Sequence, residues 1–154
     1  KYMARQKNAK RKHLIAPFSP EKADIVPEDS EFMPLAKYIE SIEDDTDEET
    51  DDTGYYDGDG TPEETVTSVS GAYTVSGIYD AEDKAQAHIA NMRYKIGEGR
   101  RVWHRVIESN NKKSFTQIAN VSDIKAGSGD ATDYEEFGCK LKWIKAPIEK
   151  GITG

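Results

Sequence analysis

The chain has 154 residues, of which 36% are hydrophobic and 32% are charged, and its formal net charge is −8. This length suffices for one domain and is short for two. A single cysteine, Cys139, excludes an internal disulfide, and no apolar run approaches the roughly 18 residues of a membrane-spanning helix. We therefore expect one soluble domain, made in a cytoplasm, with solvated segments or with surface that becomes buried on assembly.

The negative charge is concentrated in one stretch. Residues 38–83 contain sixteen Asp and Glu residues and neither Lys nor Arg. Ten of these acids lie between Glu43 and Asp59. Without the sixteen, 13 acidic residues remain against 21 basic ones, so the rest of the chain sums to +8. The sequence thus describes a mildly basic body interrupted by one acidic insertion.

The first forty residues predict an arm, a strand and an extended loop. Residues 1–12 are rich in Lys and Arg, which predicts a flexible basic N-terminal arm. The run HLIAPF at 13–18 is closed by prolines and predicts a short edge strand. Residues 19–34 predict an extended loop. Residues 35–42 fit either two helical turns or a strand, and their Tyr and Ile side chains favour a strand.

The acidic segment at 43–64 predicts a long loop, or an irregular hairpin with Tyr55 and Tyr56 at its tip. Its carboxylates cannot form a core, because burying charges without partners is too costly. A connection of this length without regular structure is more often functional or disordered than a simple link.

The second half predicts one helix and several strands. Residues 73–79 alternate in hydrophobicity and predict a strand, and Asp80 then suits the N-cap of a helix over about 80–96. Further strands are predicted at 101–107, 114–124 and 134–144, followed by a short tail at 148–154. The expected fold class is α+β: a mainly antiparallel β-sandwich or barrel over 13–147 with one flanking helix.

No set of residues predicts catalysis, a cofactor or a metal centre. His13, His88 and His104 lie in an arm, a helix and a strand, and no spacing pairs them with a catalytic or metal-binding partner. We interpret His104 and Cys139 as structural residues. The chain is therefore not expected to be an enzyme.

Calcium binding is the first hypothesis for the acidic segment, since oxygen ligands at alternate positions suit that ion. The EF-hand spacing fails here. With Gly60 at the sixth loop position, the first and twelfth positions are Tyr55 and Val66, which are not ligands. Two alternatives remain: a looser cation site that uses Asp57 and Asp59, and a solvated acidic loop.

The acidic segment and the basic arm are complementary in charge, which favours head-to-tail self-association. The arm alone also suits phosphate binding. The residues predicted to act in self-assembly are Asp44, Asp45, Asp47, Glu48, Glu49, Asp51, Asp52, Tyr55 and Tyr56 in the acidic segment, and Lys7, Lys10, Arg11 and Lys12 in the arm.

The segment AYTVSGIYDAEDKAQAHIANMRYKIGEGRRVWHRVI resembles the major tail proteins of long-tailed bacteriophages with flexible tails. The shared order is a strand at 75–79, an Asp-rich helix start at 80–83, an Ala/Gln-containing helix at 85–89, and a strand with aromatic and basic residues at 101–107. SGDATDYEEF at 128–137 is similar to the family's final hairpin, and YYDGDGT at 55–61 to its long loop.

The resemblance implies a tail tube protein. Six copies would form a ring whose joined sheets make an inner β-barrel, and rings would stack through the chain termini and a long loop. Double-stranded DNA would pass transiently and non-specifically down the lumen. The expected partners are further copies and other phage tail proteins, with no membrane. The expected location is the virion tail, and the host cytoplasm before assembly. The alternative is a monomeric acidic binding module, either a cation binder or a DNA mimic.

Overall fold

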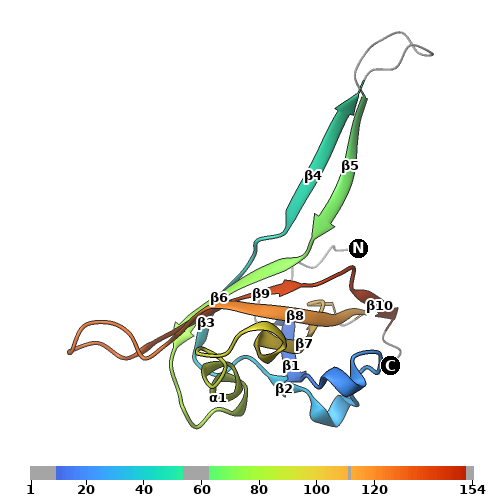
Figure 1. Ribbon diagram of the computed structural model, residues 1–154. Coiled ribbons are helices and arrows are strands. Elements are labelled where there is room, and N and C mark those ends of the chain that lie inside the picture. The colour runs from blue at the N-terminus through green and yellow to red at the C-terminus, as the bar shows by residue number, and fades with distance from the viewer. Residues whose placement is uncertain (1–9, 54–62, 111, 152–154) are drawn as a thin grey trace, which may run out of the picture.

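The computed structural model describes residues 10–53, 63–110 and 112–151 (Figure 1). Its strands are β1 Lys12–Pro17, β2 Met33–Pro34, β3 Ile39–Asp44, β4 Asp47–Thr53, β5 Glu63–Ser70, β6 Ala72–Ile78, β7 Arg101–Ile107, β8 Lys113–Ala126, β9 Glu136–Trp143 and β10 Ile148–Gly151. In these ranges the one α-helix is α1, Lys84–Ala90, and short 3-10 turns occupy Pro20–Lys22, Asp29–Glu31 and Gly97–Arg100. The predicted α+β class with a mainly antiparallel sheet and one helix is confirmed.

Eight strands form one antiparallel sheet that curls into a half-barrel. Its order is β2-β1-β7-β8-β9-β6-β3, and β10 pairs with β8. The 14-residue strand β8 pairs along one side with β7 and along the other with β10 and then β9. β4 and β5 form a separate two-stranded ribbon that projects from the body (Figure 1). The strand at 13–18, predicted at an edge, lies one place inside it, because β2 pairs with its outer side.

The core fills the inside of the half-barrel. Its buried members come mainly from β1, β6, β7, β8, β9 and α1, with Leu35 and Met92 from loops, and include Ile15, Val75, Ile89, Val102, Val121 and Leu141. A second cluster, on the opposite face of β1, β7 and β8, consists of Ala16, Phe32, Trp103 and Ile118. Burying each large apolar side chain contributes about 1.5–3 kcal/mol. Both faces of β7 are therefore covered, in the period-two pattern that its sequence indicates.

Helix α1 is shorter than the predicted 80–96. Asp83, and not Asp80, is its N-cap, and its carboxylate accepts a hydrogen bond from Gln86 N (3.2 Å). The Asp80 carboxylate instead accepts from Glu82 N and lies 3.2 Å from Lys37 Nζ. The buried Gln86 side chain accepts from Asp80 N (2.7 Å) and donates to Ile78 O (3.1 Å). The turn after β6 thus uses the residues that sequence reasoning placed in the first helical turn.

At its other end α1 stops at Ala90, and Arg100 holds the loop that follows. The Arg100 guanidinium donates hydrogen bonds to Arg93 O (2.6 Å) and Lys95 O (2.8 Å). Gly97 has a φ of 60°, which turns the chain toward β7. Ile96, the last residue of the predicted helix, lies in this loop and is exposed.

Two histidines that are far apart in the sequence meet in the core. His13 Nδ1 and His104 Nε2 lie 3.2 Å apart, edge-on to the Tyr73 ring. Arg11 Nε donates to His13 Nε2 (3.1 Å), so a neutral His13 carries its proton on Nδ1 and donates it to His104. Neutral His104 then carries its proton on Nδ1, an atom that has no partner among the described residues.

Burial, and next the Arg11 charge, lower the pKa of His13 to about 4. Burial, and then His13, hold the pKa of His104 well below its usual value. Both rings are therefore neutral near pH 7.

A substitution at Gly77 tests how closely the chain at the start of β3 packs against β6. A Cβ at this position would collide with the Tyr38 carbonyl oxygen, and Tyr38 is fixed at a φ of 60°. We expect Gly77→Ala to lower the free energy of unfolding by about 1–3 kcal/mol, because the backbone must shift. Urea denaturation measures the change. Gly151→Ala is the control, since its Cβ would meet nothing within 4 Å. Equal stability of the two variants would contradict this packing.

The buried histidine pair predicts a pH dependence of stability. Between about pH 6.5 and 4 the unfolded chain binds a proton at His13 that the folded chain does not. The free energy of unfolding should therefore fall as the pH drops through this window, by about 3 kcal/mol for His13. The lowered pKa values of Asp29, Asp45 and Asp80 act below this window, because the usual value is already 3.8.

Urea denaturation at several pH values measures the effect, and His13→Phe should make the dependence shallower. If the free energy of unfolding of that variant depends on pH as steeply as that of the wild type, a group other than His13 is responsible.

Candidate self-assembly surface

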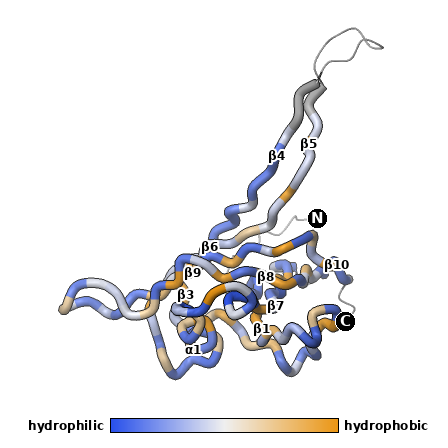
Figure 2. The backbone as a smooth tube through the Cα atoms, viewed as in Figure 1, coloured by the Kyte–Doolittle hydropathy of each residue, from blue (hydrophilic) through white to orange (hydrophobic). Residues whose placement is uncertain are grey.

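The acidic segment is a β-hairpin in its described residues. β5 runs into β6 through Gly71, and β3 runs into β4 through Asp45 and Thr46, so the hairpin extends the β3–β6 pair beyond the sheet (Figures 1 and 2). Its register runs from Asp47↔Ser70 to Thr53↔Glu63. Of the two structures predicted for 43–64, the loop is therefore wrong and the irregular hairpin is found. Tyr55, Tyr56, Asp57 and Asp59 lie outside the described residues.

Trp143 fixes the point where the hairpin leaves the sheet. The last β6–β9 pair is Ala72↔Lys142, and Trp143 N then donates to Gly71 O (2.9 Å). A Cβ on Gly71 would lie 2.5 Å from Cε3 of the indole ring. Only glycine lets the backbone cross the ring this closely. The paired strands separate from β9 at this residue.

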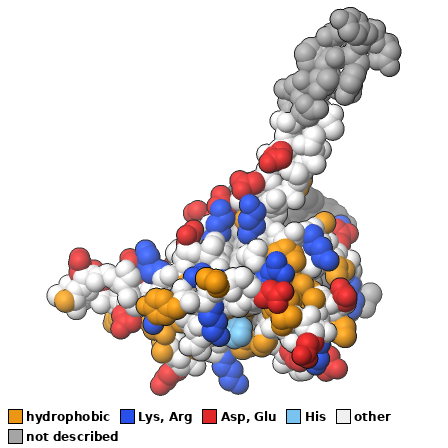
Figure 3. Space-filling model, in the orientation of Figure 1, with side chains coloured by type: hydrophobic (Ala, Val, Ile, Leu, Met, Phe, Trp, Pro, Cys, Tyr) orange, Lys and Arg blue, Asp and Glu red, His pale blue; other side chains and the backbone are white. Residues whose placement is uncertain are grey.

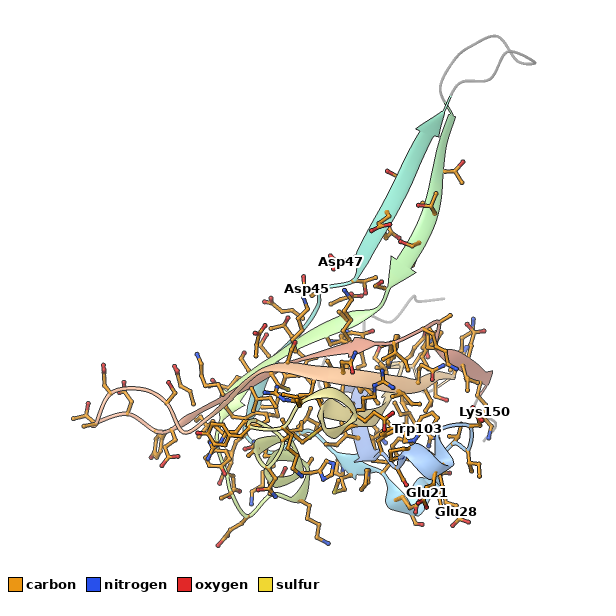
Figure 4. The ribbon with its side chains drawn as sticks, in the orientation of Figure 1. Glu21, Glu28, Asp45, Asp47, Trp103 and Lys150 are labelled. Carbon is orange, nitrogen blue, oxygen red and sulfur yellow. The ribbon has the colours of Figure 1, made fainter. Side chains whose placement is uncertain are left out.

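Two lysines of β9 bind the first acids of the hairpin. Lys140 Nζ lies 3.1 Å from the Asp45 carboxylate, and Lys142 Nζ lies 3.6 Å from that of Asp47. The space-filling view shows these opposite charges side by side at the foot of the hairpin (Figure 3), and the labels of Figure 4 mark the aspartates there. The hydrogen bond from Lys140, and then its charge, lower the pKa of Asp45, and the same contact raises the pKa of Lys140.

Asp44 also acts within its own chain, since its carboxylate accepts from Thr46 N (3.0 Å) and closes the turn into β4. Of the predicted self-assembly acids, Asp44, Asp45 and Asp47 thus shape the root of the hairpin. Because these contacts are exposed, their main effect is to orient the hairpin and not to stabilise the body.

Glu48 and Glu49, which lie farther out on β4, are exposed and have no such partner among the described side chains. Asp51 and Asp52 follow in the same strand. The register places Glu48 opposite Val69, and Thr50 opposite Val66, on one face of the hairpin. These valines are 57% and 50% exposed. A lone two-stranded ribbon is marginally stable in water, so this face is suited to contact with another surface.

The described part of the basic arm belongs largely to the body. Arg11 donates to Ile42 O on β3 (3.2 Å), and β1 already begins at Lys12. The predicted arm 1–12 therefore differs from the structure at its end. Lys10 and Lys12 are exposed, while Lys7 lies outside the described residues. Among the described side chains, the acidic segment forms its ion pairs with Lys140 and Lys142 and not with the arm.

Sequence reasoning missed Lys140 and Lys142. Their signal is the alternation KLKW in β9, which puts both lysines on the face opposite buried Leu141. The same outer face of β6, β8 and β9 carries Thr74, Ser76, Asn120 and Ser122. Around β6, β9 and the second half of β8, the sheet thus has an apolar face toward the core and a polar outer face, whereas at β1 and β7 the outer face is covered by the second apolar cluster.

Chemically reactive groups are few in the described part of the chain. Cys139 is buried in β9, and burial raises the pKa of its thiol to about 12, so the thiolate is absent near pH 7. Across residues 10–53, 63–110 and 112–151, no three His, Cys, Asp or Glu side chains are grouped as metal ligands. Of the helices in these ranges, none has the length and apolar composition to cross a membrane.

No protein-family profile and no curated protein matches this chain. Solved structures do match. One is a chain from the tail of an empty GTA particle, obtained with helical refinement and C6 symmetry: its TM-score is 0.65 at 12% identity, over 97% of this chain and 100% of that chain. Another, from the virion of a native gene transfer agent (GTA) particle, has a TM-score of 0.58 at 15% identity, over 92% and 95%. The resemblance to tail proteins is therefore confirmed at the level of the fold.

The ion pair at the root of the hairpin gives a testable prediction. Lys140→Glu should repel Asp45 and loosen the hydrogen bond from Asp45 N to Ala72 O (2.8 Å). We expect about fivefold faster hydrogen exchange of the Asp45 amide, with little change in global stability. Adding Asp45→Lys should restore the slow rate. Lys145→Glu, an exposed charge reversal just beyond β9, is the control. Equal exchange rates of the Asp45 amide in the two single variants would show that Lys140 does not hold the root of the hairpin.

Proposed function

We propose that this chain is a structural subunit of a phage-type tail tube, in which six copies form a ring and rings stack. The observation that carries the proposal is the match of nearly the whole chain to a chain from a tail with C6 symmetry. The proposal includes a place in the virion tail and contacts with other tail proteins. The properties of three surfaces support it.

The first surface is the free edge of the sheet. β3 is the last strand of the order, and on its outer side the described contact is the hydrogen bond from Arg11 to Ile42 O. A strand edge with unpaired backbone groups readily pairs with another chain. In the proposed ring, β3 joins the sheet of a neighbouring copy.

The second surface is the polar outer face of β6, β8 and β9, which we assign to the lumen. Double-stranded DNA carries about one negative charge per 1.7 Å of its axis, so a cationic lining would hold it. Asp45 and Asp47 offset the charges of Lys140 and Lys142 on this face. A polar lining with its cations offset allows DNA to pass without binding tightly.

The third surface is the outer half of the acidic hairpin. Glu48 and Glu49 keep their charges free among the described side chains, and the hairpin projects beyond the end of the sheet (Figure 1). Lys10 and Lys12, at the start of β1, are exposed cations of the same chain. We propose that the hairpin of one copy meets this basic segment of a copy in the next ring.

Electron microscopy of the concentrated protein tests the proposal. The wild type should form rings or tubes of constant diameter. Glu48→Gln/Glu49→Gln should raise the concentration needed for tube growth several-fold, roughly fivefold, without changing the melting temperature. Glu21→Gln/Glu28→Gln is the matched control, because it removes the same charge far from the hairpin (Figure 4).

A stable monomer at every protein and salt concentration would reject the tail-tube proposal. A large rise in melting temperature with calcium would instead favour the acidic binding module. If the two double variants assemble equally well, the hairpin has no part in stacking.

A further inference from the structure

The loop from residue 91 to residue 100, between α1 and β7, presents two apolar side chains to solvent. Tyr94 is 89% exposed and Ile96 is 88% exposed, the highest values of any large hydrophobic residue in the described part of the chain. A single exposed apolar side chain is ordinary on a protein surface. Two of this size, two residues apart and almost fully exposed, indicate a contact surface. We refer to Tyr94 and Ile96 as the apolar knob.

The knob is held in place by its own loop. Arg100 donates to the carbonyls of Arg93 (2.6 Å) and Lys95 (2.8 Å), and to Val121 O on β8 (3.1 Å). Lys95 N also donates to Met92 O (2.9 Å). A loop that is fixed before binding loses less conformational entropy when it docks. The knob is therefore preorganised for contact.

A complementary depression lies at the seam where the half-barrel does not close. This seam groove runs between the start of β1 and strand β3, and its volume is about 690 Å³. Its apolar lining comes from Leu14, Leu35, Ile39 and Ile42, and Glu40 and Glu43 are exposed on its β3 side. Volumes of about 300–1,000 Å³ hold drug-sized ligands, so the groove has room for two side chains.

The knob and the seam groove lie at opposite ends of β7. The knob loop leads directly into Arg101, the first residue of β7, whereas Lys12 at the groove pairs with Ile107, the last. At about 3.3 Å per residue these ends are roughly 20 Å apart. A copy therefore cannot fill its own groove with its own knob. Two different surfaces on each copy make a head-to-tail contact, which generates rings or filaments.

Charge favours the same pairing. Arg93 and Lys95 flank Tyr94 on the knob loop and are exposed. The β3 side of the groove carries the exposed Glu40 and Glu43, and its β1 side carries Arg11 and Lys12. The cations of the knob loop therefore fit the β3 side of the groove. Docking the knob would bring these opposite charges together at the rim of an apolar contact, the usual anatomy of a specific interface.

We propose that Tyr94 and Ile96 of one copy dock into the seam groove of a second copy, with Lys95 beside Glu40 and Glu43. This contact rests on the proposed self-assembly and names the side chains that join neighbouring copies.

Disulfide cross-linking of the full chain tests the contact. Ile96→Cys combined with Ser41→Cys places one thiol on the knob and one in the groove lining. Under mild oxidation this double variant should give a ladder of trimers and larger species, because each copy has two different partners. Each single variant should stop at dimers. Buried Cys139 stays in all variants. Tyr134→Cys with Ser41→Cys is the control, since Tyr134 is equally accessible, at 81% exposed, on a different loop.

A ladder from the knob variant and not from the control supports the proposal. Products no larger than dimers, or equal ladders from both, overturn it. Electron microscopy of the wild type tests the tail-tube proposal separately. Tubes in the wild type without a ladder in the knob variant would reject only the knob contact. A ladder without rings or tubes would reject only the tail-tube proposal.

A second measurement avoids cross-links. Tyr94→Ser/Ile96→Ser should raise the protein concentration needed for assembly by roughly tenfold or more, as expected for the loss of central apolar anchors. Tyr134→Ser is its control. Because all three side chains are exposed, the melting temperature should stay the same. Assembly at the wild-type concentration would overturn the proposal.

Discussion

The contact between the Trp143 ring and the Gly71 backbone determines how the two parts of this structure are joined. The main-chain N–H of Trp143 donates to Gly71 O, and its indole N–H lies 3.4 Å from His104 O in the core. The residue where β6 loses β9 as a neighbour is thus anchored to the buried cluster of Tyr73 and the two histidines. An acidic ribbon that would be marginal alone thus begins at a residue that the core holds in place.

Electrostatics then divides the hairpin into two halves. A stretch of sixteen acids without a cation must find its counter-charges elsewhere in the chain. Among the described side chains Lys140 and Lys142 provide them for Asp45 and Asp47 at the root of the hairpin, and Lys37 provides one for Asp80 after β6. Beyond the root the carboxylates repel each other and any nucleic acid, and they attract a basic surface. The residues first grouped as one self-assembly site therefore differ: those at the root orient the hairpin, and for those farther out we propose recognition of another copy.

Local patterns predicted the elements whose determinants are local. β7 was predicted at 101–107 and is found there, because its alternating side chains face two separate apolar clusters. The helix was predicted too long, because its apolar spacing continues to Ile96 although the chain leaves the helix after Ala90. The meeting of His13 with His104 depends on strands pairing across 91 residues. The lysines that pair with Asp45 and Asp47 come from β9, which is also distant in the sequence, so local patterns did not reveal them.

The geometry of the strands relates the proposed contacts to a tube. The hairpin continues the β3–β6 pair, bends away from the sheet and projects past its end (Figure 1). The free edge of β3 faces sideways, along the direction of the backbone hydrogen bonds between strands. The seam groove borders the same edge. Repeating the contact at the β3 edge closes a ring when the rotation between neighbouring copies divides a full turn. Repeating the hairpin contact stacks such rings. A subunit of this shape needs both directions to build a tube, and one direction alone would give isolated rings or a single filament.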